Sequence, residues 1–154
     1  MPNIDREALV RACMVIAAEA GRRSDPPFGA VLVAPGGVIL ARAANSQASG
    51  ADPTAHAEIN LLRTAAPAGH LPPLRGTTIV VNAEPCSMCA SAIVKAEVGE
   101  VIYGAPHEPH MDPDLSLADV LARSRRPPIV IGGVLAAECA AQIATFRALV
   151  PPPD

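Results

Sequence analysis

Apolar residues recur at helical spacing near the start of the chain. Over residues 4–21 they are separated by steps of three and four, at Leu9, Cys13, Ile16 and Ala20. Such a stripe predicts an amphipathic helix, which Asn3 or Asp5 can cap at its start and Gly21 can end. Cys13 lies on the stripe, so we expect it to pack in the core, as buried free cysteines commonly do.

The rest of the chain contains short runs rich in apolar and β-branched residues. Each run has the length and composition of a strand. Together they cover residues 29–34, 38–44, 77–81, 98–104 and 129–132. Segments of helical length follow the later runs or lie between them, at residues 53–66, 85–97, 116–123 and 135–149. Asp52 caps helices well and Pro53 suits the first helical position, so we expect the second helix to begin there.

The order of these elements predicts an α/β fold. Strands that alternate with helices imply one sheet with helices on both faces, which is a three-layer α/β/α sandwich. The β-α-β units from Thr77 onward imply parallel neighbouring strands joined by right-handed crossovers. The sequence has no internal repeat and no linker-like segment, so we expect residues 1–154 to form a single domain.

Composition and charge limit where the protein is expected to be found in the cell and which partners it is expected to bind. Hydrophobic residues make up 50% of the chain, yet no apolar run reaches the roughly 20 residues that span a bilayer. Residues 1–7 lack the basic-then-apolar order of a signal peptide, so we expect a cytoplasmic protein without membrane contact. The net charge is -3, and the aromatic residues are Phe28, Tyr103 and Phe146. Because nucleic-acid grooves combine a basic surface with stacking rings, this composition counts against a nucleic-acid partner.

Two short stretches carry the residue types of a metal site. They are Thr54-Ala55-His56-Ala57-Glu58 and Pro85-Cys86-Ser87-Met88-Cys89. In a reducing compartment, a Cys-x-x-Cys pair indicates metal or redox chemistry and not a structural disulfide. Joined to His56, the pair supplies three ligands for Zn²⁺ and leaves a fourth position for water, as in catalytic zinc sites. The alternatives are a structural zinc site, which normally has four ligands, and a redox Cys-x-x-Cys pair.

The predicted helix starts suggest how these residues act. All three ligands fall in first helical turns, where the partial positive charge of a helix N-terminus favours thiolates. Bound zinc lowers the pKa of water to about 7. Glu58 is placed to carry protons from that water to a ring nitrogen and to departing ammonia. His-x-Glu followed by Pro-Cys-x-x-Cys is the signature of zinc deaminases. We therefore predict His56, Cys86 and Cys89 as zinc ligands and Glu58 as the catalytic acid and base.

These motifs resemble the cytidine and deoxycytidylate deaminase superfamily over nearly the whole chain. Residues 27–31 (Pro-Phe-Gly-Ala-Val) and 52–58 are similar to bacterial guanine deaminases and to tRNA adenosine deaminases. The resemblance implies a homodimer and a five-stranded mixed sheet of the cytidine deaminase type, with strands 4 and 5 parallel. It also implies that the Asn45 side chain and the Ala57 backbone N–H bind the base. Without the resemblance, Asn45 would be only a turn residue at a strand end.

The segment after the fourth strand separates the two families. In the tRNA enzymes, Gly-Ala is followed by Arg-Asp and then by a Lys-x-Gly-Ala run. Here Gly104-Ala105 is followed by Pro106-His107-Glu108-Pro109-His110, and residues 147–154 lack the basic tail of those enzymes. Residues 116–121 and 133–141 nevertheless look like the C-terminal half of the tRNA enzymes, which implies the same fold in that half. Fold alone does not fix the substrate.

Further residues are candidates for contact with the substrate. Guanine deaminases carry a second acidic residue after strand four that assists proton transfer, and Asp112 or Asp114 falls in that region. The alternative is helix capping, since Asp114 and Ser116 precede a helix. His107 either lines the mouth of the site or is a solvated loop residue. Phe28 packs either on the substrate ring or in the core.

The sequence therefore predicts a zinc-dependent hydrolase acting on the C–N bond of a cyclic amidine. The favoured substrate is a free nucleobase or a related small amino-heterocycle of the guanine, cytosine or amino-triazine type, deaminated with release of ammonia. The first alternative is a tRNA-specific adenosine-to-inosine deaminase. The alternative from another class is a non-catalytic zinc-binding interaction module. Glu58 argues against this module, because a structural site has no use for a proton shuttle.

Overall fold

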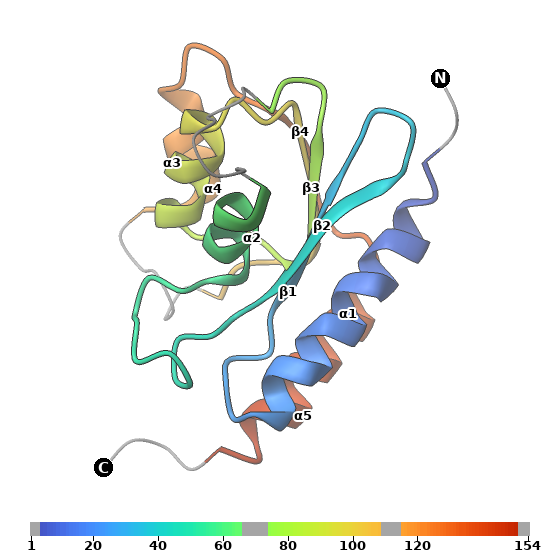
Figure 1. The fold of residues 1–154 in the computed structure, drawn as a ribbon, viewed down its shortest axis with the longest axis vertical. Coiled ribbons are helices and arrows are strands. Elements are labelled where there is room, and N and C mark those ends of the chain that lie inside the picture. Colours follow the sequence, from blue (N-terminus) through green and yellow to red (C-terminus); the bar gives the residue numbers. More distant parts are fainter. Residues whose placement is uncertain (1–3, 66–73, 109–114, 151–154) are drawn as a thin grey trace.

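The computed structural model describes residues 4–65, 74–108 and 115–150 (Figure 1). Its helices and strands follow one another in the predicted order. The helices are α1 (Arg6–Arg22), α2 (Ala57–Ala65), α3 (Ser87–Lys95), α4 (Leu117–Ala122) and α5 (Ala136–Arg147). The strands are β1 (Gly29–Val33), β2 (Ile39–Ala44), β3 (Thr78–Ala83), β4 (Glu100–Ala105) and β5 (Ile129–Ile131).

The five strands form one mixed sheet in the order β2-β1-β3-β4-β5. β1 is antiparallel to both of its neighbours, β2 and β3. β4 is parallel to β3 and to β5. This topology confirms the predicted mixed sheet with parallel strands 4 and 5.

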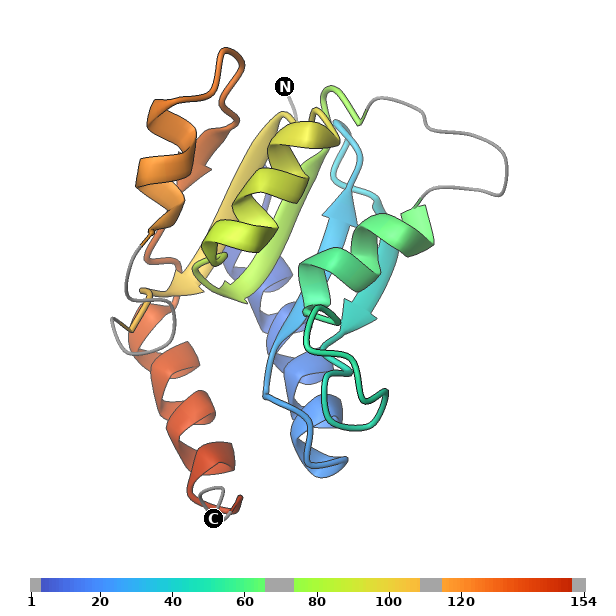
Figure 2. The same ribbon diagram turned by 90° about the vertical axis from the view of Figure 1, so that its left-hand side faces the viewer.

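Helices cover both faces of the sheet, which Figure 1 shows edge-on, and Figure 2 looks onto the face that carries α2 and α3. α1 and α5 lie next to each other on one face, where α1 packs on β1 and β3 and α5 packs on β4. On the opposite face, α2 packs on β1 and β2, and α3 and α4 lie on the same side in mutual contact. The predicted three-layer sandwich is therefore confirmed. No helix in the described ranges has both the length and the apolar character needed to cross a membrane.

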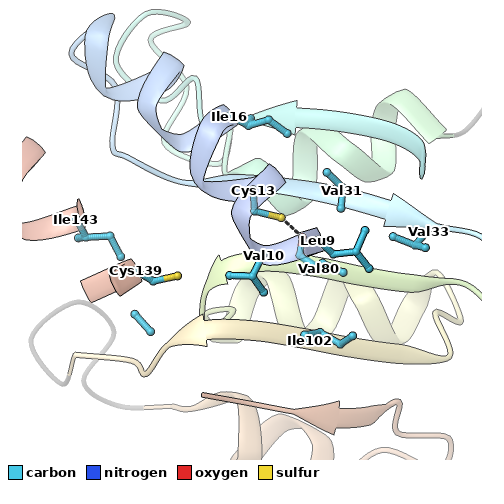
Figure 3. Close-up of a cluster of buried hydrophobic side chains, with 11 residues drawn as sticks. Leu9, Val10, Cys13, Ile16, Val31, Val33, Val80, Ile102, Cys139 and Ile143 are labelled. Carbon is cyan, nitrogen blue, oxygen red and sulfur yellow. Dashed lines mark hydrogen bonds between the residues drawn. The ribbon is translucent and has the colours of Figure 1, made fainter. Parts of the chain in front are cut away.

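The sheet divides the core into two apolar layers. Successive residues of a strand point to opposite faces, so Val31 packs with α1 and α5 whereas Leu32 packs with α2 and α3. Figure 3 shows the first of these layers, to which Cys13 and Cys139 belong. The Cys13 thiol donates a hydrogen bond to the Val80 carbonyl oxygen at 3.2 Å. Cys13 is fully buried, which confirms its predicted core role.

The entry to β1 is held in place by Asn82. The Asn82 side chain is buried, and its Oδ1 accepts a hydrogen bond from the Gly29 N–H at 3.0 Å. Its Nδ2 donates to the Pro27 carbonyl oxygen at 3.0 Å. Gly29 also lies directly against α1, because a Cβ built on it would be 2.5 Å from the Cys13 carbonyl oxygen. These contacts fix residues 27–29 at the edge of the sheet where the candidate site lies.

The second helix begins later than predicted. α2 starts at Ala57, whereas Asp52 and Pro53 were expected to cap and open it. The Asp52 side chain instead forms a local turn, since its Oδ1 accepts hydrogen bonds from the N–H of Thr54 at 2.8 Å and from its hydroxyl at 2.7 Å. Such side-chain-to-backbone bonds compete with helix formation. The prediction of the helix start is therefore wrong by four residues.

Candidate metal and catalytic site

The three predicted zinc ligands lie together. The Nδ1 atom of His56 is 3.5 Å from the Sγ atom of Cys86 and 3.5 Å from that of Cys89. One ligand atom from each residue lies within 4.8 Å of the other two. Tetrahedral zinc, with bonds of about 2.0–2.1 Å to nitrogen and about 2.3 Å to sulfur, sets these atoms about 3.5 Å apart. Both the donor set and its spacing therefore fit zinc.

His56 is positioned by the start of α2, which it directly precedes. Its carbonyl oxygen accepts a hydrogen bond from the Asn60 N–H at 2.9 Å. The Asn60 side chain also holds the preceding loop, because its Nδ2 donates to the Ala44 carbonyl and to the Ser46 hydroxyl, each at 2.9 Å. His56 therefore lies just before the helix, and its predicted place inside the first turn is wrong.

The two cysteines are positioned by the start of α3. Cys86 is the N-cap residue and Cys89 lies in the first turn, so α3 begins at Ser87 and not at Pro85 as predicted. Residues three apart on a helix face the same side. Hydrogen bonding with Cys89 lowers the pKa of Cys86 to about 4, and the neighbouring His56 acts in the same direction, whereas the same bond between the two thiols raises the pKa of Cys89. The thiolate favoured in this way is the form that binds zinc.

Glu58 lies beside this cluster in the first turn of α2. Its side chain is buried, with the residue 5% exposed. This burial raises the pKa of the Glu58 carboxyl, although hydrogen bonding with Cys89 opposes the effect. The carboxyl therefore touches a predicted zinc ligand without being one of the three ligands itself, which is the position predicted for a proton shuttle.

A cavity of about 670 Å³ adjoins the cluster, and His56, Glu58 and Cys86 line part of it. Further parts of its wall come from the loop before β1, the loop after β2, the ends of β3 and β4, residues 106–108, and α5 with the residues that follow it. Pockets of about 300–1,000 Å³ accept small organic molecules. The cavity can therefore hold a nucleobase with the reacting ring next to Glu58.

Asn45 lines the cavity and also forms a turn. Its Nδ2 donates to the Gln47 Oε1 at 2.6 Å, and its Oδ1 accepts from the Gln47 N–H at 2.9 Å. The residue is 1% exposed. An amide nitrogen has two hydrogens and an amide oxygen two lone pairs. Each of these atoms therefore keeps the capacity for one bond to a substrate, so the turn role and the binding role are compatible.

The other predicted contact residues differ in their surroundings. Ala57 is fully buried and lines the cavity at the start of α2. Phe28 lines the cavity and packs against both core layers, which confirms its core role, and its packing on a substrate ring stays a prediction. His107 lines the cavity, and its N–H donates to the Glu84 carboxylate at 3.2 Å. Asp112 and Asp114 lie outside the described residues.

Ser116, the other residue considered for capping α4, does cap that helix. Its hydroxyl accepts a hydrogen bond from the Asp119 N–H at 3.1 Å. The Asp119 carboxylate in turn accepts from the Ser116 N–H at 3.0 Å, which completes a capping box. This part of the capping alternative is therefore confirmed.

Several polar residues of the cavity wall have no signal in the sequence. Asp25 is 2% exposed and accepts hydrogen bonds from the Ser49 N–H at 2.8 Å and from its hydroxyl at 2.7 Å. Arg23 also donates to Asp25 at 3.2 Å, and to the Asn45 carbonyl oxygen at 3.2 Å. Gln47 is another member of the wall. These residues lie in loops without periodicity, so no sequence pattern indicates them.

The end of α5 contributes a charged residue to the same wall. The Arg147 Nη1 atom lies 2.8 Å from a Glu108 carboxylate oxygen, and the guanidinium lies 5.8 Å from the centre of the Phe28 ring. Arg147 and Glu108 both line the cavity. This ion pair joins the segment after β4 to the last turn of α5, two regions that the sequence pattern does not connect.

The mixed sheet and the ligand cluster at two helix starts define a protein of the zinc deaminase class. Residues 3–105 match the family described as "Cytidine and deoxycytidylate deaminase zinc-binding region". The chain belongs to this family of zinc-binding, hydrolytic deaminases. The match confirms the predicted family and agrees with zinc as the cofactor.

Curated relatives of the chain are named as tRNA enzymes. The tRNA-specific adenosine deaminase of Bacillus subtilis is 34% identical over 142 residues, which cover 91% of this chain and 87% of the relative. The tRNA(Ile)-lysidine synthase of Deinococcus radiodurans is 36% identical over 141 residues, which cover 91% of this chain and 24% of the relative. The chain thus spans about a quarter of the length of the lysidine synthases it matches.

Solved structures share the fold. One, from a study of A-to-I editing by tRNA:A34 deaminases, has a TM-score of 0.78 and 34% identity, covering 88% of this chain and 98% of the other. A guanine deaminase from Nitrosomonas europaea has a TM-score of 0.80 and 22% identity, covering 95% of this chain and 86% of the other. The second likeness shows the fold alone.

Proposed function

We propose that this chain catalyses the zinc-dependent hydrolytic deamination of adenosine in a tRNA. The observation that carries the chemistry is the position of Glu58, a buried carboxyl beside three zinc ligands and at the wall of a cavity. A non-catalytic zinc module would have no use for such a carboxyl. The named relatives support the choice of substrate.

The proposed reaction exchanges an amino group on a purine ring for a carbonyl oxygen taken from water. His56, Cys86 and Cys89 would hold zinc, which when bound lowers the pKa of water to about 7 and so provides a nucleophile near neutral pH. Glu58 takes one proton from the attacking water and delivers it to the ring nitrogen beside the reacting carbon. It then carries the second proton to the departing amino group, which leaves as ammonia. The two protons and the oxygen of one water molecule balance the reaction.

The support for an RNA substrate comes from relatives of substantial identity. The B. subtilis relative and this chain match over most of their lengths. The guanine deaminase structure, at 22% identity, bears on the fold and not on the substrate. From the sequence alone, a free nucleobase is the favoured substrate and the tRNA adenosine is the first alternative. The named relatives favour the reverse order.

A free nucleobase is the second candidate, because the cavity wall is acidic. Asp25, Glu84 and Glu108 line it, and Arg147 is paired with Glu108. The net charge of the chain is -3. Acidic walls disfavour a phosphate backbone, whereas a neutral base meets no such penalty.

One experiment separates these candidates. The zinc-loaded protein is incubated with an anticodon-arm RNA that carries adenosine at the wobble position, and separately with adenine, guanine and cytosine. Ammonia release is measured, together with inosine formation in the digested RNA. We expect inosine from the RNA and no turnover of free bases, and Glu58→Gln is the matched inactive control. Turnover of a free base alone would replace the proposed substrate, and no turnover of any compound would refute deamination.

A homodimer and a cytoplasmic location stay predictions.

A further inference from the structure

We propose that Gln47 is a positioning residue that fixes the orientation of the Asn45 amide toward the substrate. The proposal rests on the proposed function, because it concerns recognition of the base in the same cavity. Both residues line that cavity. Gln47 was not among the residues indicated by the sequence.

Gln47 contacts Asn45 through its side chain and its backbone. The Gln47 Oε1 accepts from the Asn45 Nδ2 at 2.6 Å, and the Gln47 N–H donates to the Asn45 Oδ1 at 2.9 Å. At its other end, the Gln47 Nε2 donates to the Pro53 carbonyl oxygen at 3.2 Å. The side-chain amides of Asn45 and Gln47 therefore form a chain of hydrogen bonds, which begins at a backbone donor, the Gln47 N–H, and ends at a backbone acceptor, the Pro53 carbonyl oxygen.

This chain of hydrogen bonds allows only one orientation of each amide. If the Asn45 amide alone turned over, its NH₂ would face the Gln47 N–H and its oxygen would face the Gln47 Oε1. If both amides turned over, the Gln47 Oε1 would face the Pro53 carbonyl oxygen. The backbone N–H of Gln47 would still face the NH₂ group of Asn45, which is also a donor. A backbone N–H and a backbone carbonyl cannot exchange roles, so each alternative creates at least one contact between like groups.

The fixed orientation has a consequence for recognition. Asn45 offers a substrate one N–H and one oxygen lone pair, in a set order along the amide. Paired donors and acceptors in a set order distinguish one base edge from another. The bond from Gln47 to Pro53 also ties this amide to the segment that leads into His56. The Asn45 amide, which is proposed to bind the base, is thereby held in a fixed position relative to His56, a proposed metal ligand. Fixed placement of the reacting groups accelerates a reaction.

The first test uses Gln47→Met, which keeps the length of the side chain and removes its hydrogen bonds. We expect kcat/KM for the deaminated substrate to fall about tenfold, the loss that corresponds to about one hydrogen bond. In an Asn45→Ala background, measured under single-turnover conditions, the same substitution should change kcat/KM by less than about twofold. Equal losses in both backgrounds would show that Gln47 does not act through Asn45 and would overturn the proposal.

Ser49→Ala is the matched control for damage to the loop. Ser49 lies on the same loop and binds Asp25, but has no hydrogen bond to Asn45 in the structure. We expect it to lower the melting temperature and to leave kcat/KM within about twofold of wild type. If Ser49→Ala and Gln47→Met lower kcat/KM equally, the effect of Gln47 is one of loop stability and the proposal fails.

A second measurement needs no substrate. In amide NMR spectra of the zinc-loaded protein, the Asn45 side-chain hydrogen that faces Gln47 should exchange slowly with solvent. This protection should be lost in Gln47→Met and kept in Ser49→Ala. Protection that persists in Gln47→Met would overturn the proposal. An inactive wild-type protein that shows the expected protection pattern would refute the proposed function while supporting the orientation of Asn45.

Discussion

The Nδ1 atom of His56 lies 3.5 Å from the Sγ atom of Cys89, although 33 residues separate them in the chain. The same distance separates Nδ1 from the Sγ of Cys86. The separation matches that of nitrogen and sulfur ligands around tetrahedral zinc. Because His56 directly precedes α2 and the cysteines start α3, two rigid elements hold the ligands. Zinc bound by these residues would therefore meet a prearranged set of ligands, and its binding should stabilise the packing of these two helices.

Loss of one ligand should remove the metal. We expect Cys86→Ala to lower the zinc content from one ion per chain to near none, and to lower the melting temperature of the zinc-loaded protein, because metal binding is coupled to folding. Zinc stoichiometry by mass spectrometry and a thermal melt measure both effects. Cys139→Ala is the control, since Cys139 is buried outside the site and should keep one zinc per chain. Full zinc content in Cys86→Ala would contradict the ligand assignment.

Loss of the carboxyl should separate catalysis from metal binding. In Glu58→Gln we expect zinc content to stay at one ion per chain and turnover to fall by about 10²- to 10⁴-fold, the usual contribution of general acid-base catalysis. Stability should be unchanged or higher, because burial of Glu58 disfavours its charged form. Substantial remaining turnover, measured as ammonia release, would remove Glu58 from the mechanism.

Sequence patterns predict the parts of this protein that depend on local chemistry. Val31 and Leu32 belong to a continuous apolar run, and such a run predicts a strand buried on both faces. The proposed zinc ligands can be predicted from the motifs, because zinc prefers histidine and cysteine ligands at such spacings. The start of α2 was predicted wrongly because Asp52 has two local uses, as a helix cap and in a turn with Thr54. The turn is the one that forms.

Contacts between distant loops have no such local pattern. The carboxylate of Asp25 is bound by Ser49, 24 residues further on, and no periodicity links the two. The sequence does not decide whether Phe28 lies in the core or in the cavity wall, because a residue at the edge of a sheet can belong to both. Net charge is also a weak guide to the substrate, since it averages over the whole surface and does not report on one binding face.

The buried carboxylate of Asp25 should make stability depend on pH. Burial by itself raises the pKa of Asp25, but hydrogen bonds from Ser49 and Arg23 outweigh it and lower the pKa below its usual value. A lowered pKa stabilises the fold at pH values above about 3.9, and this contribution is lost as the pH falls through the lowered value. At pH 7 we expect Asp25→Asn to reduce the free energy of unfolding by about 1–3 kcal/mol.

Urea denaturation at a series of pH values measures this difference. The gap between wild type and Asp25→Asn should narrow below about pH 4, because Asp25 of the unfolded wild-type chain then gains a proton before Asp25 of the folded protein does. Asp52→Asn is the comparison at a more exposed site, where hydrogen bonds from Thr54 also lower the pKa of Asp52. We expect a smaller gap there, because an asparagine oxygen can still accept the bonds from Thr54. A gap for Asp25→Asn that stays constant from pH 7 to pH 3 would show that the charge of Asp25 contributes nothing.

The close approach of α1 to β1 should make Gly29 intolerant of a side chain. A Cβ there would lie 2.5 Å from the Cys13 carbonyl oxygen and 2.7 Å from the Ala17 nitrogen. Both are backbone atoms of α1, so the helix itself must move. We expect Gly29→Ala to lower the free energy of unfolding by about 1–3 kcal/mol, the usual cost of overpacking. Gly36→Ala is the matched control, because nothing lies within 4 Å of a Cβ at Gly36 and its stability should change little. Equal midpoints for the two variants in urea denaturation would show that the α1–β1 contact tolerates a methyl group.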